Sequence, residues 1–293
     1  MPALDFSGPD WLMVGASGMV GRLMRGAWAD DPGIAARLVA QLRRDRPAGE
    51  RVLYWSPLDG IAPLERHARG DGPPAALIML AGVIPAPMVD YSVNVSLAVA
   101  CLEAARAVGC ERVLIASSAA VYGPADAPLP ESAPCRPVST YGASKLAMER
   151  ACAPWRAAGM DVCCLRIGNV VGADALLRNA RAGGPVRVDR FADGAGPVRP
   201  YIGPESLSRI LGTLATWPAP LPDTLNVAAP QPLGMEEIAE AARLDWRWAD
   251  APAQAVRRVT LDTAQLEAFH AFDPDECSAK GMVAQFRRAG QAP

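Results

Sequence analysis

Short apolar runs alternate with longer helical patterns over the first two thirds of the chain, and this alternation most restricts the fold. The runs have the length of buried strands and lie at residues 11–14, 37–42, 51–55, 75–80, 111–116 and 161–166. Apolar residues that return every three or four positions predict helices, most clearly over 88–108, with others over 19–29 and from Tyr141 to about 158. Strands and helices in this order predict an α/β fold with a doubly wound parallel sheet, covered on both faces.

The composition of the chain argues against several classes of protein. Half of the 293 residues are hydrophobic, and the formal charge of −2 gives no reason to expect nucleic acid or an anionic membrane as partner. The first residues lack the basic region of a signal peptide, and no apolar run approaches a membrane span of about 20 residues. We therefore expect a cytoplasmic protein that acts on a small molecule.

The cysteines and histidines give no metal site. The seven cysteines are scattered without a Cys-x-x-Cys pair, so we expect reduced thiols. Cys163 and Cys164 adjoin in an apolar run, and their side chains should point to opposite faces of a strand. His67 and His270 are far apart and lack ligand-like neighbours, so neither bound metal nor a histidine-based triad is expected.

A glycine-rich turn directly follows the first apolar run and opens a helix. Glycines at such a junction permit a tight turn and let backbone N–H groups approach a pyrophosphate at the helix N-terminus. The spacing alone would suit an ordinary turn, but at this place it predicts a Rossmann-like dinucleotide site. The expected cofactor contacts there are Gly15, Ser17, Gly18, Met19, Val20 and Gly21.

Two later segments should also touch the cofactor. The second apolar run ends in Arg43-Arg44, and an arginine there suits the 2′-phosphate of NADP, whereas an acidic residue suits the ribose of NAD. We therefore prefer NADP over NAD; in the alternative, both arginines are solvated and Asp45 binds the ribose. Leu80-Ala81-Gly82 ends the fourth run, where small residues leave room for the cofactor.

Near Gly172 the regular alternation ends. Beyond it the pattern breaks into short elements, Gly-Pro pairs and a proline-rich stretch over 217–222. We expect a dinucleotide-binding domain over 1–172 and a smaller substrate-binding lobe over 173–293, with some segments of the lobe returning to the core.

Tyr141 and Lys145 are one helical turn apart, so the phenol and the ammonium should share a helix face. A nearby cation favours ionised tyrosine, and a phenol with a lowered pKa can exchange a proton with a substrate hydroxyl. Ser118 follows the fifth apolar run, where open α/β sheets bind ligands. A serine there could donate to a carbonyl oxygen, and Asn94 could orient the lysine or a water behind it.

At this point the chain resembles the extended short-chain dehydrogenase/reductases, the NAD-dependent epimerase/dehydratase family. The resemblance rests on the Gly-x-x-Gly-x-x-Gly turn, the run 117–123 (Ser-Ser-Ala-Ala-Val-Tyr-Gly), Tyr-x-x-x-Lys and the run 165–172 (Leu-Arg-Ile-Gly-Asn-Val-Val-Gly). It implies that Ser118 polarises a carbonyl, that Tyr141 is the acid/base and that Lys145 is its partner, also holding the nicotinamide ribose. Family members often dimerise through the 88–108 helix and the Tyr141 helix. The resemblance therefore implies that this chain could form a homodimer.

Two further residues resemble the substrate side of nucleotide-sugar 4-epimerases. The resemblance implies that Asn169 contacts the diphosphate and that Arg199 binds phosphate. Ala119 and Ala120 stand where sugar dehydratases carry an Asp-Glu pair, which makes that dehydration improbable. The residues 203–206 (Gly-Pro-Glu-Ser) also depart from the family pattern, and the substrate lobe is short.

Three functions compete. The first is an NAD(P)-dependent oxidoreductase that interconverts a secondary alcohol and a ketone on a sugar, nucleotide sugar or small polyol. The second is a nucleotide-sugar 4-epimerase that uses the same residues and retains its NAD. The third is a catalytically silent nucleotide sensor, which the joint presence of Ser118, Tyr141 and Lys145 disfavours.

Overall fold

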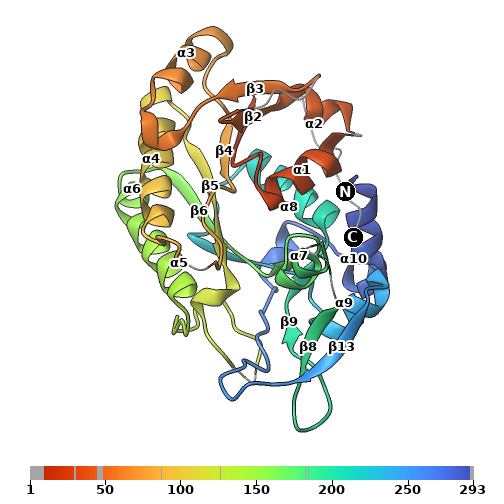
Figure 1. Ribbon diagram of the computed structural model, residues 1–293. Coiled ribbons are helices and arrows are strands. Elements are labelled where there is room, and N and C mark those ends of the chain that lie inside the picture. Colours follow the sequence, from red (N-terminus) through yellow and green to blue (C-terminus); the bar gives the residue numbers. More distant parts are fainter. Residues whose placement is uncertain are drawn as a thin grey trace.

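A seven-stranded parallel sheet forms the centre of the computed structural model, which describes residues 10–290 except 30, 45–48, 87, 126, 182 and 184 (Figure 1). The strand order is β11-β6-β5-β4-β1-β2-β3, and each neighbouring pair is parallel. The strands are β1 (Trp11–Val14), β2 (Leu38–Leu42), β3 (Arg51–Tyr54), β4 (Ala76–Met79), β5 (Arg112–Ser118), β6 (Asp161–Ile167) and β11 (Thr224–Val227). The predicted α/β class is thus confirmed, because strands buried on both faces need helices on both sides.

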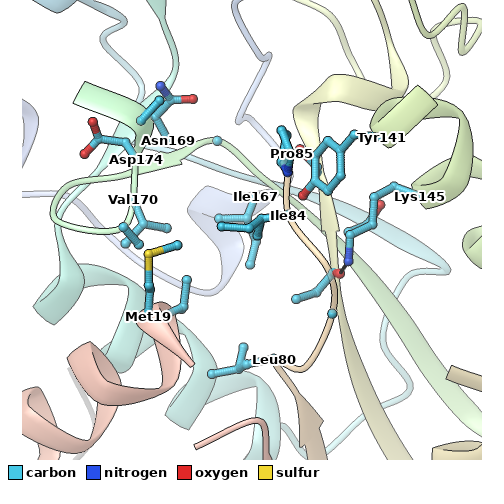
Figure 2. Close-up of a pocket in the computed structure, with 18 of the residues that line it drawn as sticks. Met19, Leu80, Ile84, Pro85, Tyr141, Lys145, Ile167, Asn169, Val170 and Asp174 are labelled. Atoms are coloured by element: carbon cyan, nitrogen blue, oxygen red, sulfur yellow. Dashed lines mark hydrogen bonds between the residues drawn. The ribbon is translucent and has the colours of Figure 1, made fainter. Parts of the chain in front are cut away.

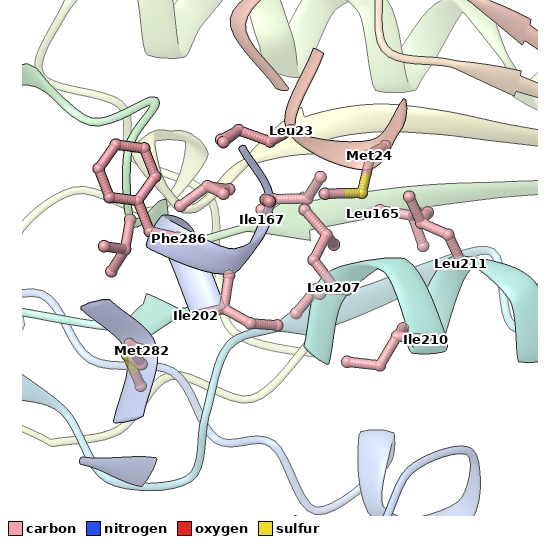
Figure 3. Packing of buried hydrophobic residues seen from close by; sticks show 14 of the residues in the cluster. Leu23, Met24, Leu165, Ile167, Ile202, Leu207, Ile210, Leu211, Met282 and Phe286 are labelled. Carbon is pink, nitrogen blue, oxygen red and sulfur yellow. The ribbon is translucent and has the colours of Figure 1, made fainter. Parts of the chain in front are cut away.

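Helices cover both faces of the sheet (Figure 1). One face carries α3 (Ala62–Asp71), α4 (Val93–Val108), α5 (Thr140–Ala151) and the short α6 (Ala153–Ala157). The other carries α1 (Met19–Ala29) and α8 (Pro204–Thr216), with α10 (Ala279–Arg288) packed against both; the short α2 (Pro32–Arg37) precedes β2. Figure 3 shows how Leu23 of α1, Leu165 of β6 and Leu207 of α8 pack together between the sheet and these helices.

Alternating side chains divide the core between these two layers. Trp11 and Met13 of β1 pack with α1 and α8, whereas Leu12 and Val14 pack with α4. In β6, Cys163 packs in the layer of α1 and α8, whereas Cys164 packs in the layer of α4. This confirms that the two side chains point to opposite faces of the sheet. All seven cysteines are free thiols.

Two predicted helices differ from the observed ones. The helix expected from residue 88 begins at Val93, because Met88 has a φ of +59°, outside right-handed helical geometry. The helix expected to reach 158 is divided at Cys152 into α5 and α6, since Pro154 has no N–H to donate. Ala143 and Ala147 are exposed on α5, and the homodimer expected through this helix stays a prediction.

Elements beyond residue 172 also contribute to the central layers. Strand β11 extends the sheet beside β6, and α8 packs under β4 and β5. Outside the central sheet, the described strands form three two-stranded pairs. The division of the chain into domains 1–172 and 173–293 stays a prediction. The pairs are β7 (Asn169–Val170) with β10 (Tyr201–Ile202), β9 (Val198–Arg199) with β12 (Leu233–Gly234), and β8 (Val186–Arg190) with β13 (Trp246–Asp250), accompanied by α7 (Ala175–Arg181) and α9 (Met235–Ala242).

None of the described helices combines the length and the apolar character needed to cross a bilayer.

Candidate active site

The glycine turn lies between β1 and α1, and its backbone needs glycine. Gly15 has a φ of +90°, and a Cβ there would lie 2.5 Å from the backbone nitrogen of Ala81. A Cβ on Gly21 would lie 2.2 Å from the Gly15 oxygen, so α1 packs directly on the turn. Ser17 and Gly18 are exposed at the start of the helix. This geometry is compatible with a dinucleotide phosphate at the start of the helix, and the predicted cofactor contacts stay a prediction.

Gln41 holds the first glycine in place, a role that the sequence analysis missed. Its side-chain oxygen accepts a hydrogen bond of 2.9 Å from the Gly15 N–H, and its amide nitrogen donates to the Trp55 carbonyl. Gln41 is buried in β2, and the oxygen and the nitrogen of its side-chain amide both form hydrogen bonds within the protein. A lone polar residue inside the apolar run 38–42 was the signal that could have revealed it.

The segment after β4 lies against the glycine turn. The N–H groups of Leu80 and Ala81 donate to the Val14 carbonyl at 2.8 and 3.0 Å. A Cβ on Gly82 would lie 2.9 Å from Asn94 Oδ1 and 3.2 Å from Lys145 Nζ. A side chain at this position would therefore displace one of these two polar groups.

Tyr141 and Ser118 meet at the carboxyl end of β5. Ser118 is the last residue of the strand, and Tyr141 lies in the first turn of α5. Both side chains line the same cavity. Burial raises the pKa of Tyr141, and the neighbouring Ser118 hydroxyl opposes that shift. The pair can therefore hold and move a proton at one substrate oxygen.

Lys145 lies one turn along α5 but does not lower the tyrosine pKa as expected. Its Nζ donates a 2.7 Å hydrogen bond to the Ala116 carbonyl and is 3.9 Å from Met148 Sδ. The side chain is 4% exposed, and this burial lowers the pKa of Lys145 to about 8. The expectation of a lowered Tyr141 pKa is thus wrong for this structure, because desolvation of the phenol is the largest effect on its pKa.

Asn94 is buried next to Lys145 but serves the backbone. Its Oδ1 accepts a 2.9 Å hydrogen bond from the Val83 N–H, and its Nδ2 donates to Ser144 Oγ at 3.0 Å. Ser144 in turn donates to the Tyr141 carbonyl. Asn94 therefore joins the loop after β4 to α5, the helix that carries both Tyr141 and Lys145. It can orient the lysine only through this helix.

These elements enclose a cavity of about 320 Å³ (Figure 2). Tyr141 and Lys145 lie on one wall, and Asn169, Val170 and Asp174 lie on the opposite wall. Met19 and Leu80 line the end next to the glycine turn. The cavity thus extends from the first residues of α1, next to the glycine turn, to Ser118 and Tyr141.

A buried polar network supports the wall that carries Tyr141, and the sequence analysis did not include it. Arg166 pairs with Glu149 at 2.8 Å and donates to Tyr122 Oη at 2.7 Å. Glu149 also accepts a 2.5 Å hydrogen bond from Ser117, the neighbour of Ser118. Glu149 is one turn beyond Lys145, and this spacing was the available signal. The network fixes α5 relative to the end of β5.

The remaining predicted residues have different positions. Arg43 and Arg44 are exposed at the end of β2, and Asp45 lies outside the described residues. Asn169 lines the cavity, as expected for a substrate contact. Arg199 does not line it. Its guanidinium donates to the carbonyls of residues 198, 256 and 257 at 2.6–3.2 Å, and the predicted phosphate contact stays a prediction.

The fold and the cavity define a dinucleotide-binding protein of the short-chain dehydrogenase/reductase type. The model of the NAD dependent epimerase/dehydratase family matches residues 11–195, which is more than half of the chain. The chain therefore belongs to this family of enzymes.

Individual relatives agree with this assignment. UDP-glucose 4-epimerase of Azospirillum brasilense is 34% identical over 189 residues, 59% of this chain and 53% of the relative. UDP-glucose 4-epimerase of Streptomyces lividans is 38% identical over 106 residues, 36% of this chain and 32% of the relative. These matches span about half or less of the relatives' lengths. The structure of MoeE5 in complex with UDP-glucose and NAD is 26% identical, with a TM-score of 0.74 over 96% of this chain and 100% of that one.

Proposed function

We propose that this protein is an NAD-dependent 4-epimerase of a nucleotide sugar. The observation that carries the proposal is that Ser118, Tyr141 and Lys145 line one cavity, together with Met19 and Val20 at the start of the helix that follows the glycine turn. The similarity to UDP-glucose 4-epimerases and to a structure with UDP-glucose and NAD supports a nucleotide sugar as substrate. These relatives favour epimerisation over the net oxidoreduction that the sequence alone placed first.

The chain's own residues would handle the proton and the oxygen. Tyr141 would act as the phenolate, and Lys145, when protonated, stabilises its negative charge before the proton is transferred. Ser118 donates to the substrate oxygen, and the phenolate accepts the hydroxyl proton and becomes neutral as the alcohol becomes a ketone. Bound NAD supplies the chemistry of hydride acceptance and return. Tyr141 then gives the proton back, and the configuration changes if the hydride returns to the other face of the ketone.

The residues present fit a dinucleotide, and we propose NAD rather than NADP. Ser17 and Gly18 are exposed at the start of α1, where a bound pyrophosphate would meet the backbone. Arg43 and Arg44, on which the NADP preference rested, are exposed. The similar MoeE5 structure contains NAD. Calorimetric titration of both dinucleotides tests this choice, and a tighter fit of NADP would overturn it.

Net oxidoreduction of a smaller sugar or polyol is the second candidate. The volume of about 320 Å³ favours it, because this is at the lower end for ligand cavities, roughly 300–1,000 Å³. The two candidates differ in how they use the dinucleotide. An epimerase returns the hydride in every turnover, whereas an oxidoreductase consumes one dinucleotide for each product.

The deciding experiment incubates the NAD-loaded protein with UDP-glucose and follows both the sugar and the nicotinamide. We expect UDP-galactose to accumulate to a constant ratio with UDP-glucose while the total reduced nicotinamide stays below the protein concentration. Reduced nicotinamide formed in proportion to the product would support the oxidoreductase. Absence of any sugar conversion, with NAD bound, would refute the epimerase proposal.

A further inference from the structure

The guanidinium of Arg199, the residue expected to bind phosphate, donates to backbone carbonyls. Its Nη1 donates to the Val198 carbonyl at 2.8 Å and to the Arg257 carbonyl at 3.2 Å. Its Nη2 donates to the Val256 carbonyl at 2.6 Å. The guanidinium thereby ties the 256–257 segment to β9. Backbone N–H groups also donate to two of these carbonyls, from Val259 to Val198 and from Val198 to Arg257, so the Val256 carbonyl depends most on the guanidinium.

A second arginine, Arg178, projects from α7 into the cavity. Among the described residues that line the cavity, Lys145 and Arg178 carry the positive charges. Lys145 is buried and directed at the Ala116 carbonyl, whereas Arg178 is partly exposed. Within the described part of the chain, its guanidinium makes neither a hydrogen bond nor an ion pair.

The acid one turn earlier does not neutralise Arg178. Asp174 also lines the cavity, but its carboxylate accepts hydrogen bonds from the N–H groups of Gly172, Leu176 and Leu177 at 2.8–3.2 Å. Asp174 therefore caps the start of α7, and its charge is already met by three backbone donors. The guanidinium of Arg178 remains available to a ligand.

We propose that Arg178, in place of Arg199, binds an oxyanion of the substrate, either a phosphate or a sugar carboxylate. A guanidinium matches both groups because its N–H groups form two parallel hydrogen bonds to paired oxygens. The proposal rests on the function proposed above and specifies how its substrate is held.

The position of Arg178 suits that task. Its helix, α7, lies on the wall with Asn169 and Asp174, opposite Tyr141 and Lys145 (Figure 2). A phosphate fixed on that wall would leave the sugar ring between the two walls, next to Tyr141. The ring could then turn while the phosphate stays bound, and epimerisation requires such a turn because hydride must reach both ring faces.

The test compares Arg178→Gln with the matched control Arg187→Gln. Arg187 is an exposed arginine on β8 of the same lobe, so both variants lose one positive charge. Binding of UDP, uridine and UDP-glucuronic acid to the NAD-loaded proteins is measured by calorimetry. For Arg178→Gln we expect UDP to bind about 10- to 100-fold more weakly, which is the usual effect of losing a charged hydrogen bond, with uridine and NAD unchanged. Arg178→Lys should recover part of the loss, which separates lost charge from misfolding.

Each outcome has one meaning. Weaker UDP binding identifies phosphate as the anion, and a loss confined to UDP-glucuronic acid identifies the carboxylate. Three results would overturn the proposal. They are unchanged binding of UDP and UDP-glucuronic acid, an equal loss in Arg187→Gln, and a native protein that binds neither ligand more tightly than uridine. If binding depends on Arg178 but no sugar is converted, the epimerase proposal fails alone. If sugar is converted and Arg178 is irrelevant to binding, this inference fails alone.

Discussion

Replacing Lys145 by methionine should make the folded protein more stable while it abolishes turnover. The ammonium is 4% exposed, and burial lowers its pKa from an ordinary value of 10.5 to about 8. At about 1.4 kcal/mol for each pKa unit, a charged Lys145 costs the native state about 3 kcal/mol. The variant also loses the hydrogen bond to the Ala116 carbonyl, worth about 1 kcal/mol. We therefore expect a net gain of about 2 kcal/mol at pH 7.

The pH dependence gives the sign of this effect. Because folding lowers the pKa of Lys145, the unfolded chain binds more protons between the two pKa values, and native stability rises with pH there. The cost is fully present below about pH 8 and declines as the pH approaches 10.5. The advantage of Lys145→Met should decline over the same interval.

Urea denaturation of nucleotide-free protein, followed by tryptophan fluorescence at several pH values, measures both effects. The matched control is Lys280→Met, because Lys280 is exposed on α10 and its loss should change stability by less than about 0.5 kcal/mol. A Lys145→Met variant that is less stable at pH 7, or whose advantage does not vary with pH, would refute the account of a costly buried ammonium. Activity that survives in the variant would separately contradict its role beside Tyr141.

Three further predictions test the supports of the site. Arg166→Met should lower the free energy of unfolding in urea by about 3–5 kcal/mol, because it leaves the buried Glu149 carboxylate unpaired; a loss below 1 kcal/mol would contradict this. Gly15→Ala should weaken NAD binding at least about tenfold in titrations, since the strained φ and the Ala81 backbone oppose a Cβ. Undiminished affinity would show that the turn does not contact the cofactor. Ser118→Ala should lower kcat about 100- to 1000-fold with unchanged NAD affinity in the same titrations, and near-native kcat would remove Ser118 from the reaction.

The sequence predicted features whose determinants lie close together along the chain. The strand 11–14, the glycine turn and the four-residue spacing of Tyr141 and Lys145 are local, so period and turn chemistry sufficed. Burial then changed the electrostatics. The spacing placed the two groups on one helix face, but the surrounding layers desolvated both side chains and reversed the expected shift of the tyrosine pKa.

Features that depend on distant segments were not predictable in this way. Arg199 binds carbonyls more than fifty residues away, and no local pattern indicates that the 256–257 segment folds over it. The pairing of Arg166 with Glu149 joins β6 to α5, which only the assembled sheet brings together. Arg178 carries no motif, and it becomes a candidate only because α7 forms a wall of the cavity.

The most direct measurement of the central claim compares Tyr141→Phe with the native protein in two assays. NAD affinity is measured by calorimetry, and conversion of UDP-glucose is followed under saturating NAD. The account predicts that the phenylalanine variant binds NAD with nearly native affinity and converts the sugar at least about 100-fold more slowly, since the proton has lost its acceptor. Conversion at a rate near that of the native protein would contradict it.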